Sequence, residues 1–124
     1  MREVKMRRPI TLDQIKNLAA AWYSALDAHA PITECYRMLA DDGLNMHFPS
    51  GDIHDFAMFE KWYGRVTSRF FDEQHTIRQV EIKWCTDEQA GIEAIIRWQA
   101  SWWEPPAAKS QRLDLEATQT WTIR

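Results

Sequence analysis

Two periodicities divide this chain. Apolar residues recur at helical spacing as far as Phe70, and from His75 they recur at every second position. An apolar residue every three or four positions gives a helix one buried side, whereas strict alternation gives a strand one buried face. The sequence therefore predicts a segregated α+β domain, in which helices come first and a meander of long antiparallel strands follows.

Three helices are predicted in the first part of the chain. A capping-box sequence at residues 11–14 opens the first helix, which should fade before Pro31. Pro31 suits the first turn of a second, shorter helix that runs to about Ala40, and Asp55 caps the third. The apolar stripes of the three helices are Leu12, Ile15, Leu18, Ala19, Trp22, Ala25 and Leu26; Ile32, Cys35, Tyr36 and Leu39; and Phe56, Phe59, Trp62, Tyr63, Val66 and Phe70.

One short strand and three long strands are predicted, with a loop at residues 49–54 and a helix end at the polar residues 72–74. The strands span residues 44–48, 75–85, 92–104 and 111–124. In the first long strand Val80, Ile82 and Trp84 share one face. In the second, the alternate positions from Ile92 to Trp102 form an apolar face. A strongly curved sheet wrapped around the helices would make a cone with an apolar throat.

Composition narrows the class of protein. A chain of 124 residues with 45% hydrophobic and 27% charged residues is typical of one globular domain, here residues 1–124. A net charge of −3 argues against a nucleic-acid surface, and no apolar run approaches membrane-spanning length. Cys35 and Cys85 have no metal-like spacing and no signal peptide is recognisable, so we expect a cytoplasmic protein with two reduced, buried thiols. Seven tryptophans are many for this size, so some should line a cavity or an interface.

Three segments carry a resemblance to a known family. They are residues 21–28 in the first helix, residues 39–49 from the end of the second helix into the first strand, and residues 118–123 in the last strand. With the order of elements from about Thr11 to Arg124, they resemble the nuclear transport factor 2-like superfamily, or cystatin-like α+β roll. The nearest branch is that of SnoaL-like polyketide cyclases and ketosteroid isomerases. The resemblance implies a cone-shaped roll, with three N-terminal helices packed on a strongly curved, mostly antiparallel sheet.

Three positions depart from the ketosteroid isomerase pattern. His47 stands where the isomerases have a carboxylate base, Trp22 where they have an oxyanion-donating tyrosine, and Gln119 near their second acid. The resemblance therefore implies cyclase-like relatives, in which a histidine base is expected, rather than a ketosteroid isomerase.

His47 is the candidate general base. The reference pKa of histidine is about 6.5, and an apolar pocket would keep the imidazole neutral and able to accept a proton. In the alternative interpretation, Asn45 or the backbone satisfies this histidine and it has no catalytic role. The apolar alternation of Leu44, Met46 and Phe48 favours that alternative, because it would turn His47 outward.

Further polar and aromatic residues are weighed in the same way. The candidates for lining a ligand pocket are Trp22, Tyr36, Trp62, Tyr63, Trp98, Gln119 and Trp121; plain core packing is the alternative for at least half of them. With His47, the residues Asp52, His54 and His75 match no zinc pattern, so no metal site is predicted. His29 needs no more than a helix-end contact to explain it. No cofactor motif is present.

The leading functional hypothesis is a pocket protein for a small hydrophobic molecule, such as a polyketide-, steroid- or terpene-like compound. If it is an enzyme, it is a cofactor-free isomerase, cyclase or hydrolase, with His47 as base and with the Trp22 N–H and Gln119 amide holding the oxyanion. The alternative is a non-catalytic ligand-binding or protein-interaction module of the same fold. The sequence leaves the substrate, and whether there is catalysis at all, open.

Two interfaces are expected. Ile95, Arg97 and Trp103 lie on the strand face away from the helices, which predicts a homodimer through that face. The resembled family usually adds one more strand after the strand that holds Trp121. We therefore expect residues 44–48 to pair with residues 111–124 or, preferably, a partner chain or loop to cover that edge. A bare edge would indicate a truncated form of a longer protein.

Overall fold

The computed structural model describes residues 10–40, 43–48 and 51–124. In chain order its elements are α1 (Leu12–Asp27), α2 (Ile32–Tyr36), β1 (Met46–Phe48), β2 (Gly51–Ile53), α3 (Phe56–Arg69), β3 (Phe70–Cys85), β4 (Ala90–Trp102) and β5 (Gln111–Ile123). Three helices followed by an antiparallel meander confirm the predicted α+β class. Among the described helices, none combines the length and hydropathy needed to cross a bilayer.

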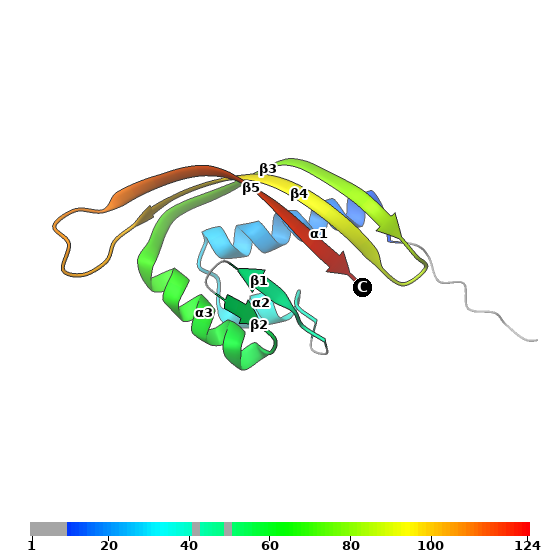
Figure 1. Ribbon diagram of the computed structural model, residues 1–124, viewed down its shortest axis with the longest axis horizontal. Helices are drawn as coiled ribbons and strands as arrows, with labels where there is room; N and C mark the ends of the chain where they lie inside the picture. Colours follow the sequence, from blue (N-terminus) through cyan, green and yellow to red (C-terminus); the bar gives the residue numbers. More distant parts are fainter. Residues whose placement is uncertain (1–9, 41–42, 49–50) are drawn as a thin grey trace, which may run out of the picture.

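The main sheet has three strands in chain order, and β1 and β2 form a separate hairpin. The sheet arches over α1, while α2, α3 and the hairpin lie on the same concave side (Figure 1). The register of β3 against β4 shifts three times, between Phe71 and Gln74, Ile77 and Gln79, and Ile82 and Trp84. Such irregularities bend a strand and increase its twist. The sheet is curved as expected, but it does not close on itself.

The helix starts are confirmed, whereas two helix ends differ from the prediction. The Thr11 side chain accepts from the Gln14 N–H and the Gln14 side chain accepts from the Thr11 N–H, which completes the capping box. Helix α2 ends at Tyr36 instead of near Ala40. Residues 72–74 do not end α3, because α3 stops at Arg69 and β3 begins at once. The start of β3 pairs with the end of β4, and this pairing between strands outweighs the polar residues 72–74, which predicted the end of a helix.

Strand β2 was not predicted. It lies inside residues 49–54, which the sequence suggested were a loop, and pairs with β1 so that His47 is opposite Asp52. A three-residue strand is too short to show alternation. In the described residues β1 pairs with β2 and not with β5, so the expected pairing of residues 44–48 with the last strand is wrong. Coverage of the β5 edge by a partner stays a prediction.

One aromatic ring joins the three helices. Phe59 of α3 is fully buried, and four ring centroids lie within 6.1 Å of its own. These rings belong to Trp22 of α1, Tyr36 of α2, and Trp62 and Tyr63 of α3. The cluster continues through Cys35 and Ile53 to Ile96 on the inner face of β4. A smaller cluster of Ile15, Ala90 and Ile92 closes the other end of α1.

The two faces of the sheet follow the predicted alternation in β4. Ile92, Ala94, Ile96 and Ala100 are all buried against the helices. The convex face, which we call the outer face, carries ion pairs, and the Arg97 guanidinium donates two hydrogen bonds of 2.9 and 2.6 Å to Asp114. Such exposed pairs contribute little to stability.

The far end of β3 departs from its predicted pattern. The register shift after Ile82 places Trp84 opposite Gly91, where a Cβ would overlap the Trp84 indole. Trp84 therefore does not share a face with Ile82, which pairs with the inward-facing Ile92. Cys35 is buried as expected, but Cys85, at the end of the edge strand β3, is exposed.

Replacement of Phe59 by alanine should be severely destabilising. We expect Phe59→Ala to lower the free energy of unfolding by about 3–5 kcal/mol, because it leaves a cavity that three helices line. Urea unfolding followed by circular dichroism measures this. Phe71→Ala is the matched control, since Phe71 is 42% exposed, and should cost about 0.5 kcal/mol or less. Equal losses in the two variants would contradict the central role of Phe59.

The predicted homodimer can be tested on the same protein. We expect light scattering at high protein concentration to give the mass of two chains, and Ile95→Lys to give one, because a lysine would place a charge in an apolar contact. Glu34→Lys on exposed α2 is the control and should leave the mass unchanged. A monomeric wild type would rule the dimer out.

Candidate functional site

Polar and aromatic side chains gather between the C-terminal half of α1 and the inner face of the sheet. We call this set the inner cluster. Its members are Tyr23, Asp27 and His29 from α1 and the turn after it, Glu73 and His75 from β3, Trp98 from β4 and Gln119 from β5.

Asp27 holds His75 at two points. Its Oδ2 accepts the His75 backbone N–H at 2.9 Å, and its Oδ1 lies 2.5 Å from His75 Nδ1. A carboxylate only accepts hydrogen bonds, so Nδ1 of the neutral ring carries the proton and Nε2 keeps its lone pair. The His75 side chain is 10% exposed. This tautomer, oriented by a carboxylate, is the one that a general base requires.

Tyr23 connects His75 with Gln119. Its buried ring stacks on His75 with centroids 5.0 Å apart, and its hydroxyl donates to Gln119 Oε1 at 2.5 Å. Burial raises the pKa of Tyr23 far above its ordinary value, so the phenol stays protonated and can donate. Because the Gln119 oxygen is engaged, its NH₂ group is the part of the amide available to donate to a ligand oxygen.

Glu73 makes a second contact with a histidine. Its Oε2 lies 2.7 Å from His29 Nε2, and its Oε1 accepts the Trp98 indole N–H at 3.3 Å. The Glu73 side chain is 9% exposed, whereas that of His29 is 30% exposed. Trp98 also stacks on His75, with centroids 6.0 Å apart. The indole therefore touches both carboxylate–histidine pairs.

Local backbone geometry positions these residues. Glu73 and His75 both contact Trp98 of β4, so both side chains are directed to the inner face. The register shift between Phe71 and Gln74 adds residues to β3 at this point, and Asp72 has a φ of 49°. His29 also has a φ of 49°, just after α1 ends. Few residues other than glycine adopt such values.

The predicted pocket residues fall into two groups that meet at Tyr23. Trp22, Tyr36, Trp62 and Tyr63 pack around Phe59. Trp98, Gln119 and Trp121 surround Tyr23 and His75. The Tyr63 hydroxyl donates to the Ala30 carbonyl at 2.5 Å. Whether these residues line one ligand cavity stays a prediction.

The catalytic role of His47 also stays a prediction. Its backbone lies in β1, opposite Asp52, but its side chain is outside the described part of the chain.

The sequence did not reveal Asp27, His29, Glu73 or His75 as parts of one site. His29 and Asp27 are separated from Glu73 and His75 by 44 and 48 residues, and no local motif links them. The available signals were the i, i+4 spacing of Tyr23 and Asp27 on α1 and the alternation of Glu73 and His75. The described residues contain no group of three potential metal ligands close enough to share an ion.

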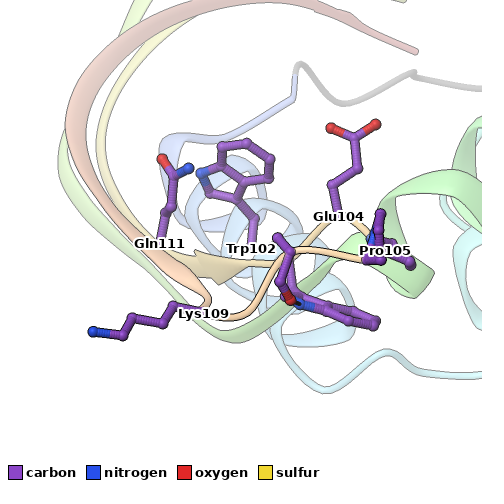
Figure 2. Close-up of a pocket in the computed structure, with 8 residues that line it drawn as sticks. Trp102, Glu104, Pro105, Lys109 and Gln111 are labelled. Atoms are coloured by element: carbon purple, nitrogen blue, oxygen red, sulfur yellow. Dashed lines mark hydrogen bonds between the residues drawn. The ribbon is translucent and has the colours of Figure 1, made fainter.

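Two hollows in the surface lie elsewhere. The larger, about 420 Å³, is at the tip of the β4–β5 hairpin, where Gln111 and Trp102 stand across from Glu104 and Pro105 (Figure 2). The smaller, about 260 Å³, lies between the start of α1 and the end of β5. Neither is lined by the inner cluster, which solvent reaches mainly at His29 and Asp27, whose side chains are 30% and 23% exposed.

Burial of two tyrosines predicts a loss of stability in alkali. Burial raises the pKa of Tyr23 and of Tyr63. The folded chain therefore holds these protons more tightly than the unfolded chain. The resulting stabilisation is present below about pH 10, the pKa of an unfolded tyrosine, and is lost as the pH rises from there.

Tyrosinate absorbance measures this effect. We expect at least two of the three tyrosines to ionise only as the far-ultraviolet dichroism is lost, and Tyr23→Phe to remove one of these late ionisations. Complete ionisation near pH 10 in a chain that is still folded would contradict the prediction.

Comparison with known proteins gives matches in structure but not in sequence. No protein-family model and no curated protein matches the chain. A putative polyketide cyclase from a Silicibacter species superposes with a TM-score of 0.61 at 15% identity, over 93% of this chain and 83% of the other. Putative polyketide cyclases from Pseudomonas putida and Xanthomonas campestris give TM-scores of 0.58 and 0.56. The Pseudomonas protein is 19% identical, over 86% of this chain and 80% of its own length. The Xanthomonas protein is 17% identical, over 88% of this chain and 80% of its own length. The chain therefore shares the fold of these putative polyketide cyclases, an α+β fold of the kind that the resemblance implied.

Proposed function

We propose that the protein binds a small, largely apolar carbonyl compound on the concave side of the sheet and moves a proton on the carbon beside the carbonyl. The reaction we propose is a cofactor-free isomerisation or cyclisation. Support for a cyclisation comes from the structural neighbours, which are named as putative polyketide cyclases. The main support for the proposal is the contact between Asp27 and His75. The Asp27 carboxylate accepts hydrogen bonds from the His75 backbone N–H and from Nδ1, so Nε2 is left to act as a base.

Each member of the inner cluster has a role in this reaction. His75 Nε2 takes the proton, and Asp27 orients the ring and stabilises the imidazolium that forms. The Gln119 NH₂ group donates to the developing oxyanion, and Tyr23 fixes the orientation of that amide. The indole faces of Trp98 and Trp121 provide apolar surface for the body of the ligand.

His47 is the second candidate base. By resemblance it stands where the ketosteroid isomerase branch has its carboxylate base, whereas the support for His75 is its contact with Asp27. Separate replacement of the two histidines decides between them.

A non-catalytic binding module is the second candidate function. The observation that favours it is the complete pairing of buried polar side-chain atoms in the described part of the chain. Satisfied buried polar atoms are also what a purely structural cluster needs. The two functions differ in one measurable respect, because a module has no turnover.

The probe 5-nitrobenzisoxazole tests for a positioned base. A base removes its ring C–H proton, the electron pair forms a nitrile, the N–O bond breaks and a coloured phenolate leaves. We expect the wild type to accelerate this opening over buffer of the same pH. His75→Ala should lower the rate by about 10²–10⁴-fold. Asp27→Asn should lower it about tenfold or more, because the preferred tautomer is lost.

His54→Ala is the matched control, since this histidine is exposed before α3, and the rate should not change. A loss in His47→Ala with full activity in His75→Ala would transfer the role of base to His47. No acceleration by a folded wild type would refute the enzymatic proposal and favour the binding module.

A further inference from the structure

We propose that His29 is the acid of the same site and that Glu73 is its positioning residue. This inference rests on the proposed function. His75 removes a proton from the substrate, and the His29–Glu73 pair supplies a proton to the oxygen on which charge develops.

The first support is the way Glu73 is held. Its carboxylate is almost buried, yet each of its oxygens has a nitrogen partner, His29 at Oε2 and Trp98 at Oε1. Because a carboxylate only accepts hydrogen bonds, His29 Nε2 donates to Glu73, and Nδ1 is the ring nitrogen left to face a ligand. The His29 side chain is 30% exposed, so it can regain a proton from water after each reaction.

The second support is the proximity of the two pairs. Glu73 and His75 are two residues apart on β3. Trp98 stacks on His75 and donates to Glu73, so one indole contacts both. The shared indole places the Asp27–His75 and Glu73–His29 pairs next to each other, as a reaction that takes a proton at one atom and gives one at a nearby atom requires.

The third support is the backbone at the two ends of the contact. His29 itself and Asp72, next to Glu73, both have a φ of 49°. They are the non-glycine residues with positive φ in the described ranges. This conformation is unfavourable for residues with a Cβ, and it clusters at functional sites. The two residues with positive φ therefore lie on either side of the same contact, His29 as one partner and Asp72 as the neighbour of the other partner, Glu73.

The protons balance in this scheme. His75 Nε2 takes the C–H proton, and the electron pair of that bond forms a new π bond. In a carbonyl substrate the carbonyl π pair then moves to the oxygen, whereas in a benzisoxazole probe the N–O bond breaks. The oxygen takes a proton from Nδ1 of the His29 imidazolium, the nitrogen that Glu73 does not hold. Water then returns the proton from His75 to His29. An acid helps most when the oxygen that gains the electron pair is strongly basic, whether it is an enolate oxygen or the phenolate oxygen that leaves.

Two probes that differ in the basicity of the leaving oxygen test the role of the acid. The phenolate released from 5-nitrobenzisoxazole leaves readily, whereas that from unsubstituted 1,2-benzisoxazole is more basic. We expect Glu73→Gln and His29→Asn to lower the rate with the unsubstituted probe about tenfold more than the rate with the nitro probe. Glu116→Gln, on the outer face, is the matched control and should change neither rate.

The ratio of the two rates separates an acid from a structural role. An equal loss with both probes, or no loss, overturns the inference while the proposed function stands, provided that the nitro probe still depends on His75. No turnover of either probe by the wild type overturns both. If circular dichroism shows that Glu73→Gln does not fold, His29→Asn decides, since His29 is the more exposed partner.

Discussion

Burial of the Phe59 ring determines where the helices lie. Rings from α1, α2 and α3 all pack on it, and the same cluster reaches Ile96 on the inner face of the sheet. This cluster is larger than the second one, around Ile15, and it is the one that all three helices share. The position of α1 relative to β3 follows from this packing, and the inner cluster depends on that position.

The inner cluster lies where the aromatic core meets solvent. Tyr23 belongs to both, since its ring is part of the core and its hydroxyl reaches Gln119. Charged groups this close to a core are unfavourable unless they are paired. Asp27 and Glu73 are each paired with a histidine, and the two imidazoles remain the groups able to exchange protons. The same contacts that make the cluster stable also set the tautomer of His75.

Curvature of the sheet brings these groups together. Register shifts bend β3 around α1, so that Glu73 and His75 face the end of that helix. Leu115 lies opposite Trp98 on the edge strand β5, and it is 42% exposed although it lies on the inward side of its strand. The concave surface is thus partly polar and partly apolar. This division suits a ligand with an apolar body and one polar end.

The sequence by itself determined the order of helices and strands, the helix caps at Thr11 and Asp55, and the buried face of β4. Each of these depends on neighbours a few residues apart, so periodicity and capping preferences are sufficient. Only the tertiary structure decided the β2 strand, the early start of β3 and the pairing of Asp27 with His75. That pair spans 48 residues, and its contact depends on where packing places α1 and on how register shifts bend β3, which no local pattern encodes.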